Sequence, residues 1–352
     1  MAINTKDLGG PLLASVSRSF YLSIRVLPKP LRAPIGLAYL LARASDTIAD
    51  SAEVPVETRL RHLAAFERMI RSGRTDGLAA LQQDIHTSHE GETVLLSKLD
   101  GCLHWLAETN NKDRSEIVDV LQKIIRGQTL DLERFRGGER IVALQTAEEL
   151  DEYTYLVAGC VGEFWTRLCL NHLPECATLG LADLRRLGGE FGKGLQLVNI
   201  LRDLPEDLGN GRCYLPETEL RAAGTSPSPV MDQPAKAQAV FDRWRERAVR
   251  QLEHGYHYLV ALRSARLRVA CFLPWYLGLR TLALLGEPGA LERTDKIKVS
   301  RSSVRFALIL ALISAFSERA LNWANQRAMR AAGFAPSVPD PTSEESSSAV
   351  SP

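Results

Sequence analysis

Residues 192–208, GKGLQLVNILRDLPEDL, place polar side chains at helical spacing within a largely apolar stretch. The polar positions are three, four and four residues apart, so on a helix they form one stripe: Gln196, Asn199, Asp203 and Asp207. Leucine, valine and isoleucine occupy much of the remaining circumference. This pattern predicts a buried helix that carries two carboxylates on one face.

Helical periodicity recurs along the rest of the chain, and alternating patterns typical of strands are nearly absent. The predicted helical segments are residues 31–50, 54–72, 93–108, 112–135, 148–170, 181–208, 235–262, 269–285 and 299–332. Long helices with apolar stripes predict an all-α, single-domain bundle over residues 1–334. Proline, glycine and serine predict a surface loop at residues 223–234 and a disordered tail at residues 335–352.

Composition excludes several classes of protein. A formal net charge of +1 and few aromatic residues argue against a nucleic-acid partner. The six cysteines form no C-x-x-C pair and the seven histidines no H-E-x-x-H motif, which argues against zinc and favours reduced thiols. No export signal precedes the first helix, and the apolar run Phe306–Phe316 is shorter than the roughly 20 residues that span a bilayer. We therefore expect a cytoplasmic protein.

A second acidic pair lies in residues 39–50, YLLARASDTIAD. Asp46 and Asp50 are four residues apart and share a helix face with Tyr39 and Arg43. An isolated pair of this kind is usually a solvated helix face. Here both pairs follow apolar segments, and buried like charges are unfavourable unless they bind cations. Oxygen ligands without histidine or cysteine favour Mg²⁺.

Two such pairs would hold a metal-bound diphosphate between them, and bound metal makes that group a better leaving group. Arg43, Arg202 and Arg212 are the nearest candidates for bidentate contacts to the phosphates. An apolar cavity would shield the resulting carbocation from water. The predicted chemistry is ionisation of an allylic diphosphate. Coupling, chain elongation and cyclisation all remain possible at this point.

Four blocks in this order resemble the squalene/phytoene synthase family: SRSF (residues 17–20), YLLARASDTIAD (39–50), YTYLVAGCVGEFW (153–165) and QLVNILRDLPEDLGNGRCYLP (196–216). The resemblance covers residues 17–301. It implies the helical isoprenoid synthase fold with a central apolar cavity. It also implies head-to-head coupling of two prenyl diphosphates through a cyclopropylcarbinyl diphosphate. Elongation enzymes would carry D-D-x-x-D motifs, and neither acidic site has that form.

The resemblance also assigns roles to individual residues. It implies that Mg²⁺ is held by Asp46, Asp50, Asn199, Asp203, Glu206 and Asp207. It implies that Tyr153 takes part in the proton transfer of the first condensation. Without the resemblance, a core tyrosine with a satisfied hydroxyl would be nearly as good an interpretation. Positions matching substrate contacts are Ser17, Phe20, Tyr39, Gln196, Asn199 and Arg212, and those matching cofactor- or diphosphate-facing residues are Arg18, Arg43 and Arg202.

Two positions depart from the family pattern. Ala49 stands where squalene synthases similar to the animal enzymes have an acidic residue, so one oxygen fewer surrounds the first pair. Pro205 lies within the second motif and should bend the helix or end it early. We therefore expect the placement of Asp207 to be less regular than that of Asp203.

Lys296-Ile297-Lys298 resembles the Lys-Ile-Arg segment that contacts NADPH in squalene synthases. We therefore predict a squalene synthase that uses two farnesyl diphosphates, Mg²⁺ and NADPH. Phytoene or dehydrosqualene synthase is the alternative, and a non-catalytic assembly factor is a further one. The basic and apolar residues from Lys296 onward predict either core packing or peripheral contact with the inner face of a membrane.

Overall fold

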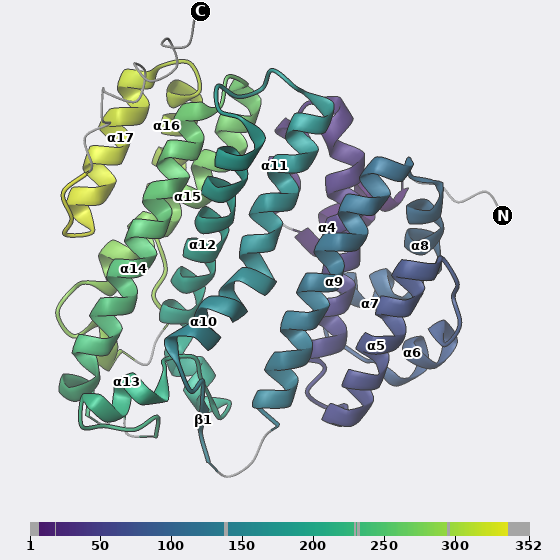
Figure 1. Ribbon diagram of the computed structural model, residues 1–352, viewed down its shortest axis with the longest axis horizontal. Coiled ribbons are helices and arrows are strands. Elements are labelled where there is room, and N and C mark those ends of the chain that lie inside the picture. Colours follow the sequence, from purple (N-terminus) through teal and green to yellow (C-terminus); the bar gives the residue numbers. More distant parts are fainter. Residues whose placement is uncertain are drawn as a thin grey trace, which may run out of the picture.

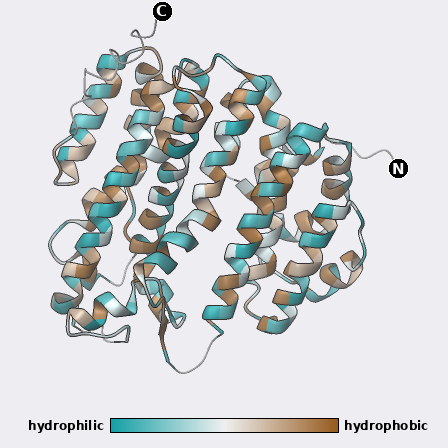
Figure 2. Cartoon of the chain, in the orientation of Figure 1, coloured by the Kyte–Doolittle hydropathy of each residue, from teal (hydrophilic) through white to brown (hydrophobic). Residues whose placement is uncertain are grey.

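The computed structural model describes residues 7–17, 19–136, 140–228, 230, 233–293 and 296–336. Arg18 and the part of the expected tail from residue 337 onward lie outside these residues. The described chain is a bundle of helices with one very short parallel strand pair, which confirms the all-α prediction (Figure 1). Most helix ribbons carry both hydrophilic and hydrophobic turns, as expected of amphipathic helices that share a core (Figure 2).

The elements follow one another in this order: η1 Leu8–Leu12, α2 Leu13–Ser17, α3 Ser19–Val26, α4 Lys29–Asp50, α5 Val56–Ser72, α6 Leu78–Asp84, α7 Glu90–Ser97, α8 Leu99–Glu108, α9 Asn111–Arg134, β1 Val142–Ala143, α10 Ala147–Thr154, η2 Tyr155–Gly159, α11 Cys160–His172, α12 Leu181–Gly209, β2 Arg212–Cys213, α13 Glu217–Ala222, α14 Pro234–Ala261, α15 Ala265–Leu285, η3 Ala290–Glu292, α16 Arg301–Ser314 and α17 Glu318–Ala331. Here η1 and η2 are π-helical turns and η3 is a 3₁₀ turn.

Most of the predicted helices have nearly the bounds expected from periodicity, but three are interrupted. The segment predicted at 299–332 forms two helices, because the Ser317 side chain accepts a hydrogen bond from the Ala320 amide and starts α17. The segment at 93–108 breaks at Lys98, and the segment at 148–170 contains the π-helical turn η2. Pro205 does not end α12, which continues to Gly209.

The bundle is arranged around α4 and α12, the two helices that carry the acidic motifs. Helix α4 packs against α9 and α5, whereas α12 packs against α14, α11, η2 and α15. Figure 1 shows the α4–α9 group on one side of the molecule and the α11–α17 group on the other. The two motifs therefore belong to different halves of the bundle, and α9, α10 and η2 lie between them.

Helix α15 is long and apolar enough to span a membrane by composition, but about two thirds of its most apolar window is buried inside the bundle. Its side chains include Phe272, Trp275 and Tyr276, all of them buried. We therefore interpret α15 as a core helix.

Helix α12 approaches α11 and η2 closely because glycines line the contact. A Cβ atom at Gly162 would lie 1.9 Å from the Gly188 carbonyl oxygen, and one at Gly192 would lie 2.3 Å from the Ala158 carbonyl oxygen. Gly162 and Gly192 therefore allow the helices to pack closely. The close approach fixes the position of the second acidic motif relative to η2.

We predict that Gly162→Ala destabilises the protein by about 3 kcal/mol, since the neighbouring backbone would have to move to admit a methyl group. Gly10→Ala is the matched control, because no heavy atom lies within 4 Å of a Cβ built there. Urea unfolding followed by circular dichroism measures both variants. Equal stabilities would show that α12 can shift without loss.

Candidate active site

Both acidic motifs line a single cavity of about 830 Å³ between the two halves of the bundle. The cavity wall is built from α4, α9, α10, η2, α12, β2 and the segment before α16. Twelve of the residues predicted from the sequence line this cavity: Arg43, Asp46, Asp50, Tyr153, Gln196, Asn199, Arg202, Asp203, Glu206, Asp207, Arg212 and Lys296. Apolar lining comes from Ala49, Ile124, Leu132, Val157 and Ile200.

The first pair lies on the last turns of α4. Gln128 on α9 donates a hydrogen bond of 2.6 Å to Asp46 Oδ1. Desolvation, followed by repulsion from Asp50, raises the pKa of Asp46 from 3.8 to about 7. Asp50 is open to the cavity, but the surrounding wall also raises its pKa by desolvation. The basic side chains nearby therefore compensate the negative charge of Asp46 and Asp50 only in part.

Arg43 stands one turn before this pair and is held by Glu92 on α7. The two side chains form a charge-assisted hydrogen bond, and the Thr87 hydroxyl donates to the other Glu92 oxygen at 3.0 Å. Glu92 is buried, and although its burial would raise its pKa, Arg43 and Thr87 together lower it. Glu92 thus fixes one end of the Arg43 guanidinium at the cavity wall.

The second pair, on α12, is unevenly compensated. Arg202 contacts both oxygens of Asp203, at 2.9 and 2.5 Å, and Lys296 Nζ lies 2.9 Å from Asp203 Oδ1. Burial alone would raise the pKa of Asp203, but these two cations lower it. In the described part of the chain Asp207 forms no salt bridge, and desolvation and the Asp203 charge raise its pKa from 3.8 to about 7. Lys296 also reaches Glu206, at 3.2 Å.

The cavity carries more negative than positive charge. Six carboxyl groups and four cationic side chains line it, a formal excess of two negative charges when all are ionised. The Gln128 Oε1 atom beside Asp46 is buried and has no hydrogen-bond partner among the described residues. The carboxylate oxygens of the cavity and Gln128 Oε1 suit a hard cation such as Mg²⁺.

Within the part of the chain that the structure describes, no three His, Cys, Asp or Glu residues are grouped closely enough to hold a metal by themselves. Mg²⁺ usually retains waters and is shared between one or two carboxylates and substrate phosphates. The acidic residues therefore fit a cation that arrives with a phosphorylated ligand.

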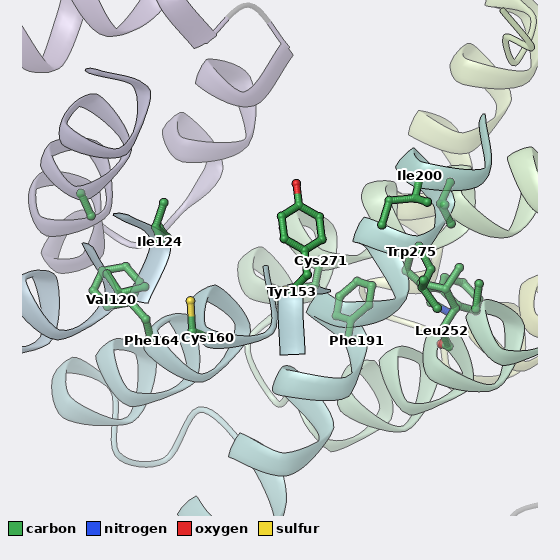
Figure 3. Packing of buried hydrophobic residues seen from close by; sticks show 14 of the residues in the cluster. Val120, Ile124, Tyr153, Cys160, Phe164, Phe191, Ile200, Leu252, Cys271 and Trp275 are labelled. Carbon is green, nitrogen blue, oxygen red and sulfur yellow. The ribbon is translucent and has the colours of Figure 1, made fainter. Parts of the chain in front are cut away.

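Tyr153 is buried at the cavity wall and begins a chain of hydrogen-bonding groups. Its hydroxyl lies 3.5 Å from the Tyr214 hydroxyl, which donates to Asp131 Oδ1 at 2.8 Å. The two rings stack with centroids 5.0 Å apart. Burial raises the pKa of both tyrosines well above the ordinary value and that of Asp131 to about 6. Figure 3 shows Tyr153 between two groups of buried apolar side chains.

Arg212 and Tyr214 reach the cavity because a short backbone pairing holds their segment in place. Strand β2 pairs in parallel with β1, and Gly211 precedes it with a φ of +76°, a left-handed conformation that favours glycine. Arg212 Nη1 then donates to Asp131 Oδ2 at 3.2 Å. Arg212 therefore lines the cavity and at the same time forms a salt bridge with Asp131.

Several predicted residues are not brought to this cavity. The buried Ser17 hydroxyl donates to the Leu13 carbonyl of its own helix, and the Tyr39 hydroxyl donates to the Val16 carbonyl at 3.3 Å. Lys298 is exposed and does not line the cavity. The side chain of Phe20, like all of Arg18, lies outside what the structure describes. The roles of these residues stay predictions.

The motifs missed four residues that complete the site: Glu92, Gln128, Asp131 and Tyr214. Tyr214 lies within the family motif at residues 196–216, but its sequence context does not indicate that its hydroxyl bonds to Asp131. Gln128 and Asp131 are three residues apart on α9 and form half of a polar stripe, a signal weaker than either aspartate pair.

The raised pKa of Asp207 predicts a pH-dependent loss of stability when no divalent cation is bound. The Asp207 carboxyl holds its proton more tightly in the folded state than in the unfolded state. At pH values below about 4 the group is protonated in both states and its charge costs no stability. As pH rises from about 4 to about 7, the buried negative charge lowers the free energy of unfolding progressively. Asp207→Asn should therefore become more stable than the wild type across that range, by at least about 1 kcal/mol at pH 8.

Chemical unfolding of both proteins in a chelating buffer at several pH values measures this difference. Asp76→Asn is the control, since Asp76 is an exposed residue that pairs with Arg74. A difference that does not vary with pH would contradict the electrostatic account of the second pair.

Comparison with known proteins finds similar chains among squalene synthases and phytoene synthases. A curated squalene synthase of Gibberella zeae is 29% identical to this chain over 80% of the chain. A bifunctional lycopene cyclase/phytoene synthase of Gibberella fujikuroi is 29% identical over 63% of the chain and 37% of its own length. The chain spans only 59% of the length of the Gibberella zeae protein.

The fold is shared with solved structures. A complex of TcSQS with the ligand E5700 superposes with a TM-score of 0.75 at 23% identity, covering 93% of this chain and 92% of that one. The model of the squalene/phytoene synthase family matches residues 13–303, which include both acidic pairs, Tyr153 and Lys296. The chain belongs to the squalene/phytoene synthase family.

Proposed function

We propose that this chain is a squalene synthase, which joins two farnesyl diphosphates head to head through presqualene diphosphate and uses NADPH to complete the reaction. The observation that carries the proposal is the cavity in which two aspartate pairs from α4 and α12 leave an excess of negative charge. A diphosphate is itself strongly anionic. Such a cavity can receive it only together with divalent cations.

The residues that would hold Mg²⁺ are Asp46, Asp50, Asn199, Asp203, Glu206 and Asp207, all of which line the cavity. When bound, the metal stabilises the negative charge that develops on a departing diphosphate. Lys296 already lies between Asp203 and Glu206, so this part of the wall accommodates positive charge. Arg43, Arg202 and Arg212 can contact phosphate oxygens from the rim.

Two observations favour squalene over phytoene or dehydrosqualene as the product. The similarity to the squalene synthase of Gibberella zeae extends over more of the chain than the similarity to the bifunctional phytoene synthase. Lys296 reaches into the cavity while Lys298 remains exposed beside it, so the basic segment could contact the phosphates of NADPH. Phytoene or dehydrosqualene synthase remains the second candidate.

The tyrosine chain supports a role for Tyr153 in proton transfer. A buried phenol with a raised pKa does not act as a base unless its own proton can leave. We propose that the Tyr214 proton moves to Asp131 Oδ1 and the Tyr153 proton moves to the Tyr214 oxygen. The Tyr153 oxygen can then accept a proton from the substrate. Asp131 is suited to the end of the chain because its pKa is about 6.

Product analysis tests the proposed function. The purified protein is incubated with farnesyl or geranylgeranyl diphosphate and Mg²⁺, with and without NADPH, and the products are identified by mass spectrometry. We expect squalene only with farnesyl diphosphate and NADPH. A C40 hydrocarbon would instead support the phytoene synthase alternative.

Asp46→Asn and Asp203→Asn should each lower Mg²⁺-dependent diphosphate release at least about a hundredfold, since each removes a charge that the cation requires. Asp76→Asn on the surface should retain wild-type activity. Diphosphate release is measured by a coupled phosphate assay. A protein that releases no diphosphate in any form would favour the non-catalytic assembly role.

Tyr214→Phe should lower kcat about a hundredfold with little change in KM, because it interrupts the chain from Tyr153 to Asp131 but keeps the stacked ring. Tyr258→Phe is the matched control, since its buried hydroxyl bonds to Thr166 away from the cavity. Steady-state kinetics over a range of pH measures both. If the relay operates, the Tyr153→Phe and Tyr214→Phe losses will not add in the double variant.

A further inference from the structure

The outer face of α16 is apolar and exposed. Six large apolar side chains on α16 and the turn that follows it are between 40% and 84% accessible to solvent: Phe306, Leu308, Ile309, Leu312, Ile313 and Phe316. Trp323 on α17 is 46% exposed and packs edge-on against Phe306. A contiguous apolar surface of this kind usually marks a contact with another molecule or a membrane.

This exposure does not arise from a helix that lacks a core-facing stripe. Ala307, Leu310, Ala311 and Ser314 are buried, and α16 packs against α15 and α17. The helix therefore has two apolar faces. One packs against the core through Leu310 and small residues, and the other places most of the large side chains in solvent.

Arginines surround the exposed face. Arg301 and Arg305 precede Ile309 at intervals of four, so they continue the same face toward the start of α16. On α17, Arg319 and Arg327 lie four residues before and after Trp323. Arg327 also lies over the rings of Phe306 and Trp323, at 5.8 and 5.5 Å from their centroids. Across the described residues, none of these four arginines forms a salt bridge with a carboxylate.

A small polar recess adjoins the apolar face. It has a volume of about 240 Å³ and is lined by Arg280, Arg327, Ser302, Ser303, Tyr276 and Phe306. In the described part of the chain Arg280 also has no carboxylate partner. Two guanidinium groups and two hydroxyl groups beside exposed apolar side chains match the chemistry of a lipid phosphate next to its acyl chains.

We propose that the face formed by α16 and α17 binds the surface of an anionic phospholipid bilayer, with Ile309, Leu312 and Phe316 inserted and the arginines at the level of the phosphates. Helix α16 has 14 residues, about 21 Å, which is too short to span a bilayer. The proposal rests on this surface and is independent of the proposed reaction. Figure 1 shows α17 at the edge of the molecule and α16 beside it.

Charge favours a bilayer over a second copy of this chain as the occupant. A symmetric contact through this face would bring the arginine rims of two copies together, and within α16 and α17 Glu318 is the only acidic residue. An anionic bilayer instead supplies opposite charge to the rim and an apolar layer to the centre.

Flotation with vesicles of phosphatidylcholine, alone or mixed with phosphatidylglycerol, tests the proposal on the full chain. We expect clear binding to the mixed vesicles and weak binding to neutral ones. The triple variant Ile309→Ser, Leu312→Ser, Phe316→Ser should reduce binding at least about tenfold. Arg280→Gln and Arg327→Gln should each reduce binding to mixed vesicles about fivefold.

Val94→Ser is the control, since Val94 is an exposed apolar residue on α7, in the other half of the bundle. Should the triple variant fail to fold, Phe316→Ser alone replaces it, because that side chain is the most exposed. Absence of binding by the wild type, or equal binding by all variants, overturns the proposal. So does a dimer in light scattering that the triple variant dissociates.

Asp203→Asn separates this proposal from the proposed function. The inactive variant should bind the mixed vesicles as well as the wild type does, since Asp203 lies in the cavity and not on the α16–α17 face. Loss of activity with retained vesicle binding would leave the proposed surface intact. A catalytically active protein that binds no vesicle would overturn the surface alone.

Discussion

The site depends on the unfavourable confinement of carboxylates within one cavity. Asp46 and Asp207 come from different halves of the bundle, yet desolvation and a neighbouring aspartate raise the pKa of each to about 7. Raised acid pKa values mean that the cation-free fold is less stable than it could be at neutral pH. The apolar core must compensate for this loss, a pattern typical of functional sites.

The scaffold keeps these charges together by close backbone contacts. Glycines at the α11–α12 contact allow the two helices to approach closely, and the β1–β2 pair fixes Arg212 beside Asp131. The salt bridge of Asp203 with Arg202 and Lys296 neutralises one end of the acidic surface. The opposite end, at Asp46 and Asp50, retains its repulsion. The cavity is thus electrostatically asymmetric.

Periodicity predicted the helices and both aspartate pairs because each depends on neighbours three or four residues apart. The remaining site residues depend on contacts between distant segments. Asp131 bonds to Tyr214 across 83 positions and Gln128 to Asp46 across 82, distances over which local spacing carries no information. Local capping by Ser317 divided the last predicted helix, although the apolar run before it reads as continuous.

The run at residues 306–316 also shows why hydropathy alone could not choose between core and surface. On a helix its residues divide between two faces, with Ala307, Leu310 and Ala311 against the bundle and Ile309 and Leu312 in solvent. Core packing and surface exposure are therefore both correct for the same segment. Small residues let α16 lie close to α15, and the large side chains on its opposite face stay in solvent.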